Sequence, residues 1–269
     1  MRFPKFLRRS VVSSTDPAVI SFTGGMGAQI ISASIYFAKR QAGEAAYADM
    51  SYFQTPESIA TVGKPGDCSH WAWQLAPFGL QPDSFVLATK EVLKTSQVLS
   101  DGPRKLELGL EALAKPQVQQ FFSLPEAKDI LPPSFADGYL CIHIRRGDYV
   151  NVASHLVPDY EFVQIAAKFS GLIPNVAVLS DSPIDPALRV AVSAMYKGAT
   201  FLDNTEAYMA HRVMRGSRIL VCSNSQFSLI AAMLNPSALL VIPRQWFDGQ
   251  DRAIEAPLHA RCTFQILSL

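Results

Sequence analysis

The chain has 269 residues, of which 49% are hydrophobic and 17% charged, and a formal net charge of +1 at pH 7. A nearly neutral chain lacks the strong basic excess of proteins that coat nucleic acid, so no nucleic-acid partner is expected. The hydrophobic fraction predicts a sizeable buried core, and the length suits one large domain or two small ones. The sequence has no apolar run of about 18 residues, so no transmembrane helix is expected.

The chain begins with a basic segment that contains Arg2, Lys5, Arg8 and Arg9 and then turns polar from Ser13. It lacks the apolar stretch of a signal peptide. Two interpretations stay open, a solvated chain end and a peripheral contact with an anionic membrane surface. The four cysteines show no metal-ligand spacing and suit reduced thiols. We therefore expect a cytoplasmic protein, with association at the inner face of the membrane as the alternative.

A strand predicted over residues 18–22 leads into the glycine-rich segment Thr23-Gly24-Gly25-Met26-Gly27-Ala28-Gln29. An apolar helix is predicted from Ile30 to about Arg40. This layout suits a nucleotide-sized site, because glycines let backbone N–H groups approach a ligand and a helix N-terminus favours anions. The segment is not GxGxxG, because Ile30 takes the place of the third glycine. A structural tight turn is the alternative.

Further strands are predicted over residues 45–49 and 85–87, and a helix over residues 106–122 that Pro116 interrupts. Residues 54–80 are rich in proline, glycine and aromatic side chains, which indicates loops and short turns.

Trp71 and Trp73 belong to this loop-rich segment and are interpreted as packing residues, with stacking on a sugar as the alternative. A proline pair at residues 132–133 indicates a linker. It predicts a boundary near residue 130 between an acceptor-side domain, residues 1–130, and a nucleotide-sugar domain, residues 131–269.

The segment from Tyr139 to Val150 begins with an alternating run that is predicted to be a strand ending at Arg145, with Cys141, His143 and Arg145 on one face. Two adjacent arginines, at positions 145 and 146, end the strand before Gly147-Asp148. Burying them is costly without anionic partners, and a guanidinium group suits carboxylate or phosphate. The segment therefore predicts an anion site, and a structural Arg–Asp pair that closes a turn is the alternative.

Strands and helices alternate beyond this segment. The predicted helices cover residues 160–170, 187–196, 206–215 and 226–234, and the predicted strands cover residues 176–179, 200–202, 218–222 and 238–242. This rhythm predicts a parallel sheet with helices on both faces, whose ligands bind beyond the carboxyl ends of the strands. The predicted strand ends carry polar groups at Arg145, Ser180-Asp181, Asp203-Asn204 and Ser223-Asn224-Ser225.

These polar groups suit an anionic ligand that carries a ring at one end. Arg145 and the start of the helix after Ser225 would supply positive charge and N–H donors to two phosphates. Asp181 would accept from the N–H groups of a base such as guanine, or would cap the next turn. The sequence has no Asp-x-Asp motif, and clustered carboxylates are what usually hold a divalent metal against pyrophosphate. We therefore expect no metal.

Four segments resemble motifs of the inverting α-1,2-fucosyltransferases of glycosyltransferase family 11. His143-Ile144-Arg145-Arg146-Gly147-Asp148-Tyr149 resembles the HxRRxDY signature, and residues 23–29 are similar to the GGxGNQ loop. Residues 223–232 resemble the NSTFSWWAA segment, and Ser180-Asp181 resembles the SDD-type turn. The four segments follow the family's order.

The resemblance implies a GT-B fold, with two Rossmann-like domains facing across a cleft. It implies transfer of fucose from GDP-fucose, in α-1,2 linkage, to an oligosaccharide acceptor that ends in galactose, without cofactor or metal. By resemblance, Arg145 would act catalytically by stabilising the departing GDP, and Asp148 would hold the arginine. Substrate-binding roles are implied for His143, Arg146, Gly25, Gly27, Gln29, Asp181, Asn224, Ser225, Phe227 and Ser228.

The chain departs from the family pattern at Ala28, where the family has Asn, and at Gln226 and Leu229-Ile230. These changes keep two alternatives open, a transferase that uses another nucleotide sugar and a non-catalytic relative that binds GDP or carbohydrate. The motifs name no general base. Asp148, His155 and Asp159 are candidates, each with a structural or solvated role as the alternative.

Overall fold

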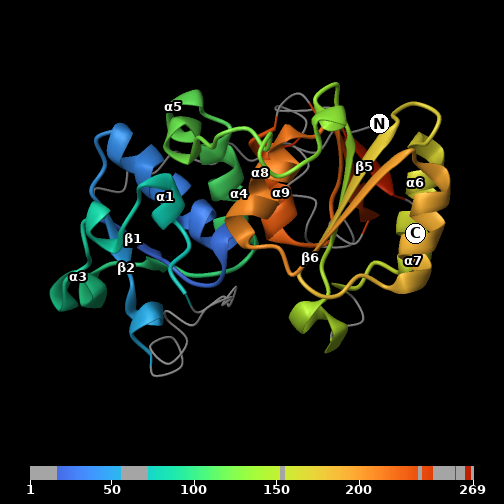
Figure 1. The fold of residues 1–269 in the computed structure, drawn as a ribbon. Helices are drawn as coiled ribbons and strands as arrows, with labels where there is room; N and C mark the ends of the chain where they lie inside the picture. The colour runs from blue at the N-terminus through green and yellow to red at the C-terminus, as the bar shows by residue number, and fades with distance from the viewer. Residues whose placement is uncertain are drawn as a thin grey trace, which may run out of the picture.

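The structure is a computed structural model that describes residues 17–55, 72–151, 155–235, 238–244, 258 and 264–267. These residues form two α/β units, each built on a parallel sheet (Figure 1). The first unit is drawn in blue and green, and the second runs from green-yellow to red. The predicted α/β class with Rossmann-like parallel sheets is confirmed. The basic segment at residues 2–9 lies outside the described residues.

The first sheet has the strand order β2-β1-β3. Its elements are β1 (Ala18–Ser21), β2 (Ala46–Asp49) and β3 (Val98–Leu99). The strand predicted over residues 85–87 is reduced to a single bridge between Ala48 and Leu87. In its place, the two-residue strand β3 pairs with β1. A two-residue strand is too short to show alternation of hydrophobic and polar residues, so it could not be predicted from the sequence.

Helix α1 (Met26–Gln41) begins earlier than the predicted start at Ile30. Gly25 is its N-cap residue and offers no side chain to the first turn. The Gln74 side chain takes that place, because its Oε1 accepts from the Met26 backbone N–H at 2.8 Å. Gly27 and Gln29 are therefore residues of the first helical turn rather than of a loop.

The remaining helices of the first unit are short. They are α3 (Lys90–Thr95), α4 (Pro103–Leu113) and α5 (Pro116–Gln119), with 3₁₀ turns η1 (Ser51–Gln54), η2 (Ala76–Phe78), η3 (Pro82–Ser84) and η4 (Gln120–Phe122). A further 3₁₀ turn, η5 (Pro133–Phe135), lies between α5 and the second sheet in the chain. The helix predicted over residues 106–122 is thus divided where Pro116 starts a new one. Trp73 packs as predicted, since its ring contacts Phe22, Phe53 and Phe85. Trp71 lies outside the described residues.

The second sheet has the strand order β6-β5-β4-β7-β8-β9, and all of its neighbouring strands are parallel. The strands are β4 (Leu140–Ile144), β5 (Asn175–Ser180), β6 (Gly198–Asp203), β7 (Ile219–Val221), β8 (Leu239–Pro243) and β9 (Phe264–Leu267). Each strand that the sequence predicted here is present within a few residues. The four-residue strand β9 was not predicted.

Helices cover both faces of the second sheet (Figure 1). They are α6 (Asp159–Phe169), α7 (Pro186–Met195), α8 (Ala207–Gly216) and α9 (Gln226–Met233), and a 3₁₀ turn η6 (Gly147–Asn151) follows β4. Helices α6 and α7 lie on the outer face, and α8 and α9 lie between the sheet and the first unit. All five residues of β4 are therefore buried, which is typical of parallel sheets.

The two units share one hydrophobic cluster, which runs from Ile20 and Ile30 of the first unit to Leu229 and Ile230 of α9. The outer face of the second sheet packs in a separate cluster with α6 and α7. The division of the chain at residue 130 stays a prediction. None of the helices in the described ranges is long and apolar enough to cross a membrane.

Candidate functional site

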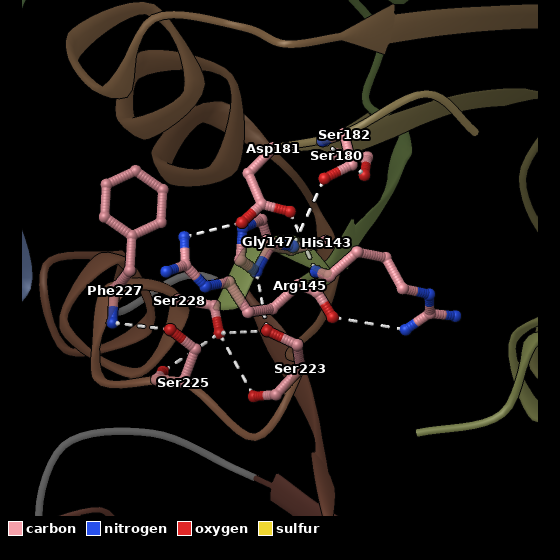
Figure 2. Close-up of polar contacts among 11 residues, drawn as sticks. His143, Arg145, Gly147, Ser180, Asp181, Ser182, Ser223, Ser225, Phe227 and Ser228 are labelled. Carbon is pink, nitrogen blue, oxygen red and sulfur yellow. Dashed lines mark hydrogen bonds and ion pairs between the residues drawn. The ribbon is translucent and has the colours of Figure 1, made fainter. Parts of the chain in front are cut away.

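The strand order of the second sheet has a topological switch point between β4 and β7. From β4 the chain adds β5 and β6 on one side, then crosses over and adds β7, β8 and β9 on the other. In open parallel sheets, ligands bind in the crevice beyond the carboxyl ends of the strands at such a switch point. Figure 2 shows the polar side chains that gather there, from the ends of β4 and β5 and from the start of α9.

Arg145 follows β4 directly and is held in place by two neighbours. Its Nη1 lies 2.6 Å from Oδ2 of Asp181, and its Cζ lies 5.2 Å from the centre of the Tyr149 ring. The Arg145 side chain remains 30% exposed. The guanidinium group is therefore oriented by the protein, and part of the Arg145 side chain faces solvent.

Asp181 fixes both the arginine and the turn after β4. Its Oδ1 accepts from the Arg146 backbone N–H at 2.8 Å. Gly147, at φ +27°, passes so close that an added Cβ would lie 2.6 Å from Oδ2 of Asp181. The Gly147 N–H donates to Oγ of Ser182 at 3.2 Å. Asp181 thus holds Arg145, the function that the resemblance implied for Asp148, whose side chain lies outside the described part of the structure.

Arg146 has a different carboxylate partner from Arg145, and its Nη1 donates to the Arg145 carbonyl oxygen at 3.2 Å. Its guanidinium group forms an ion pair with Asp159 and lies 5.9 Å from the centre of the Phe162 ring. Both partners belong to α6. Arg146 therefore connects α6 to the turn that follows β4. Asp159, one of the candidate bases, is engaged in this ion pair.

His143 is buried at 4% exposure and connects the ends of two neighbouring strands. Its Nδ1 lies 2.8 Å from Oγ of Ser223, which follows β7. Burial, and then the charge of Arg145, lower the pKa of His143 to about 3. The imidazole is therefore neutral at physiological pH, and its contribution to the site is position rather than charge.

Ser225 caps α9, because its Oγ accepts from the Phe227 backbone N–H at 3.3 Å. Ser228 Oγ lies 3.2 Å from the carbonyl oxygens of both Ser223 and Ser225 and fixes the approach to the helix. Asn224, between these serines, is buried. The start of α9 is thereby held at the switch point.

The Phe227 ring lies between two histidines, with centre-to-centre distances of 5.4 Å to His143 and 4.6 Å to His211. His211 Nε2 lies 3.2 Å from the Phe227 carbonyl oxygen, and its Nδ1 is buried without a partner in the described structure. Burial, and then the charge of Arg215, lower the pKa of His211 to about 3. This contact could not be predicted from the sequence, because it depends on how α8 packs on α9.

The glycine-rich segment meets this site through packing. A Cβ added to Gly27 would lie 2.8 Å from the backbone nitrogen and 2.9 Å from Cα of Phe227. The first turns of α1 and α9 are therefore in backbone contact. Gly25, the N-cap residue of α1, lies two residues before Gly27.

Gln29 is fully buried and joins three backbone groups of the first unit. Its Nε2 donates to the carbonyl oxygens of Gly24 at 2.7 Å and Ala72 at 2.8 Å, and its Oε1 accepts from the Gln74 backbone N–H at 2.9 Å. These contacts orient Gln29 into the first unit. Sequence reasoning missed Gln74, which lies in a loop-rich segment without a periodic pattern.

His155, another candidate base, packs its ring 5.1 Å from that of Tyr149. A separate polar cluster of Thr23, Asp101 and Lys105 lies at the end of the first sheet. The sequence did not single out Asp101 or Lys105, because their contacts join segments far apart in the chain.

Comparisons of the sequence with protein-family models and with curated proteins give no match. Among solved structures, the fold is similar to a glycosyl transferase family 9 protein from Veillonella parvula, with a TM-score of 0.49, 10% identity and coverage of 94% of this chain and 86% of that one. It is also similar to E. coli ADP-heptose LPS heptosyltransferase II, with a TM-score of 0.47, 11% identity and coverage of 94% and 90%. It is also similar to POFUT1 in complex with GDP-fucose, with a TM-score of 0.46, 12% identity and coverage of 83% of this chain and 95% of that one. At these TM-scores and identities, the assignment of function depends on the site itself.

Proposed function

We propose that the protein is an inverting glycosyltransferase that moves fucose from GDP-fucose to a hydroxyl group of a galactose-terminated glycan, in α-1,2 linkage. One observation carries the proposal. Asp181 holds the Arg145 guanidinium group in place at the end of β4, at the switch point of the sheet where the Ser225-capped helix α9 begins. The resemblance of residues 143–149 to the fucosyltransferase signature supports GDP-fucose as the sugar nucleotide.

The charges at this place suit a nucleoside diphosphate. A guanidinium group is always positively charged, and the geometry of its N–H donors suits phosphate oxygens. The first turn of α9 adds backbone N–H groups and the positive end of the helix dipole. Because His143 is neutral, the positive charge of the site comes from Arg145 and the helix. We assign Asp181 to holding Arg145, because its two oxygens contact the Arg145 guanidinium group and the Arg146 backbone N–H.

In the reaction, the acceptor oxygen attacks the anomeric carbon of fucose from the face opposite to GDP. The bond from that carbon to the phosphate oxygen breaks, and its electron pair leaves with GDP. The transition state resembles an oxocarbenium ion, so catalysis depends mainly on stabilising the departing diphosphate. Arg145 and the start of α9 would supply that stabilisation without a metal ion.

The nucleotide is tested by thermal shift with GDP, UDP and ADP, because a ligand stabilises the folded protein that binds it. We expect GDP to raise the melting temperature most. A larger shift with UDP or ADP would indicate a transferase that uses another nucleotide sugar.

The activity is tested by GDP release from GDP-fucose with a panel of galactosides. Removing one charged contact to a leaving group typically costs a factor of about 10²–10³ in rate, and we expect this loss for Arg145→Ala. The matched control is Arg104→Ala, since Arg104 is exposed on α4 and pairs with Glu107. GDP binding without turnover in the unmodified protein would identify a non-catalytic relative.

A further inference from the structure

A polar cluster of Thr23, Asp101 and Lys105 lies at the carboxyl end of the first sheet. Lys105, from α4, is 3% exposed, and its Nζ donates to the Ser21 carbonyl oxygen at 2.5 Å and to Oδ1 of Asp101 at 2.8 Å. The Thr23 hydroxyl donates to Oδ2 of Asp101 at 2.5 Å. Both oxygens of this carboxylate are thus oriented by fixed donors, one of which opens the glycine-rich segment.

Asp101 and Lys105 share a small cavity with the first residue of α9. A cavity of about 10 Å³ between α1, α4 and α9 is lined by Ala28, Asp101, Lys105 and Gln226, among others. Gln226 is the first residue of α9 and follows the cap residue Ser225. Asp101 therefore comes from the first unit and lies where that unit meets the start of α9.

Lys105 and Asp101 form an ion pair whose two side chains differ in solvent exposure. Lys105 is buried, whereas the Asp101 side chain is 61% exposed. A carboxylate has about four acceptor positions, so Asp101 can accept a further hydrogen bond from outside. Burial alone would raise the pKa of Asp101, but hydrogen bonds from Lys105 and Thr23 lower it below its usual value. Asp101 is therefore ionised at neutral pH, and burial lowers the pKa of Lys105.

We propose that Asp101 binds the attacking hydroxyl group of the glycan acceptor and takes its proton during transfer. This inference rests on the proposed function. As the acceptor oxygen bonds to the anomeric carbon and GDP departs with the electron pair, the hydroxyl proton passes to a carboxylate oxygen of Asp101 and then to water. A weak base suits a dissociative reaction, in which the proton leaves late. Thr23 and Lys105 are positioning residues.

The test is Asp101→Asn, which keeps the shape of the side chain and one acceptor oxygen but removes the base. We expect the kcat for transfer to a galactoside to fall by about 10²-fold or more, while the Kd for GDP stays within about twofold of the original. The control is Asp83→Asn, an exposed aspartate in η3 of the same unit.

Rescue by azide distinguishes a general base from a structural residue. Azide is an anionic nucleophile that attacks the anomeric carbon without losing a proton, so it needs no base. We expect azide to restore GDP release from GDP-fucose in Asp101→Asn. If Asp101→Asn does not fold, the double variant Asp101→Asn/Lys105→Met replaces it in the azide assay, because it removes both charges of the ion pair. Normal transfer by the variant, or lost transfer that azide does not restore, would overturn the role of Asp101 alone. No turnover in the unmodified protein would overturn the proposed function and this assignment together.

Discussion

Asp181 and Arg145 meet because of the register between two strands. Ile144 of β4 pairs with Ser180 of β5, so the next residues of each chain segment, Arg145 and Asp181, emerge side by side. The sequence indicated the residue types and the strand ends, and it left open a structural Arg–Asp pair. The family resemblance, rather than a local pattern, implied Asp148 as the residue that holds Arg145. The partner's identity depends on strand order, which local patterns do not encode.

Gln29 offers a test of buried hydrogen bonding at a single residue. Gln29→Leu would leave the Gly24 and Ala72 carbonyl oxygens and the Gln74 N–H without their partner. Each unsatisfied buried group costs about 1–3 kcal/mol, so we expect the free energy of unfolding to fall by at least about 2 kcal/mol in urea denaturation. Gln41→Leu is the control on the same helix, because Gln41 is exposed and makes one long hydrogen bond. Equal losses in the two variants would contradict this account of Gln29.

The two buried histidines predict that acid destabilises the fold. In the unfolded chain a histidine gains a proton near pH 6.5, whereas the folded-state pKa of His143 and His211 is about 3. Below pH 6.5 the unfolded chain therefore binds more protons, and stability falls by up to about 1.4 kcal/mol per pH unit for each histidine.

His211→Gln removes one of these two groups. We expect the loss of unfolding free energy between pH 6 and pH 5 to be about 1 kcal/mol smaller in this variant than in the original protein. Urea denaturation of both proteins at pH 6 and at pH 5 measures this change in unfolding free energy. The same pH dependence in both proteins would show that His211 is not held neutral by burial.

At the scale of elements, the contact between the first turns of α1 and α9 depends on Gly27. A Cβ there would collide with backbone atoms of Phe227 and Gln226, which cannot turn away as a side chain could. Overpacking typically costs about 1–3 kcal/mol, against a gain of about 1 kcal/mol in helix propensity for alanine. We expect Gly27→Ala to destabilise the protein and to weaken GDP binding, because it shifts the start of α9.

Gly171→Ala is the control for this helix contact, since a Cβ at Gly171 meets no atom within 4 Å. Unfolding free energy and the GDP Kd measure both variants. If Gly27→Ala is as stable as Gly171→Ala and binds GDP equally well, the close approach of α1 to α9 is wrong.

The elements themselves were predictable to different degrees. The strands and helices after residue 139 were found from their alternation, because a doubly wound sheet repeats one pattern. The start of α1 was misplaced, since Gln74 from a distant loop caps Met26. The two-residue strand β3 is too short to show a period. Long periodic segments were thus predictable, and elements that depend on distant partners were not.

At the scale of the whole molecule, one hydrophobic cluster passes through both units. Elements that share a core unfold together, because exposing one part removes the packing of the other. We expect calorimetry to record one transition whose calorimetric and van't Hoff enthalpies agree. Two resolved transitions would show that the units are stabilised separately.

The central claim is that Arg145 and the start of α9 bind the diphosphate of a guanine nucleotide. Titration calorimetry with GDP and GMP tests it directly, because the two ligands differ by the β-phosphate. In the original protein we expect GDP to bind at least about tenfold more tightly than GMP, a difference of about 1.4 kcal/mol. In Arg145→Gln that preference is expected to disappear, while GMP affinity changes little. A GDP preference that survives Arg145→Gln, or no GDP preference in the original protein, would contradict the account.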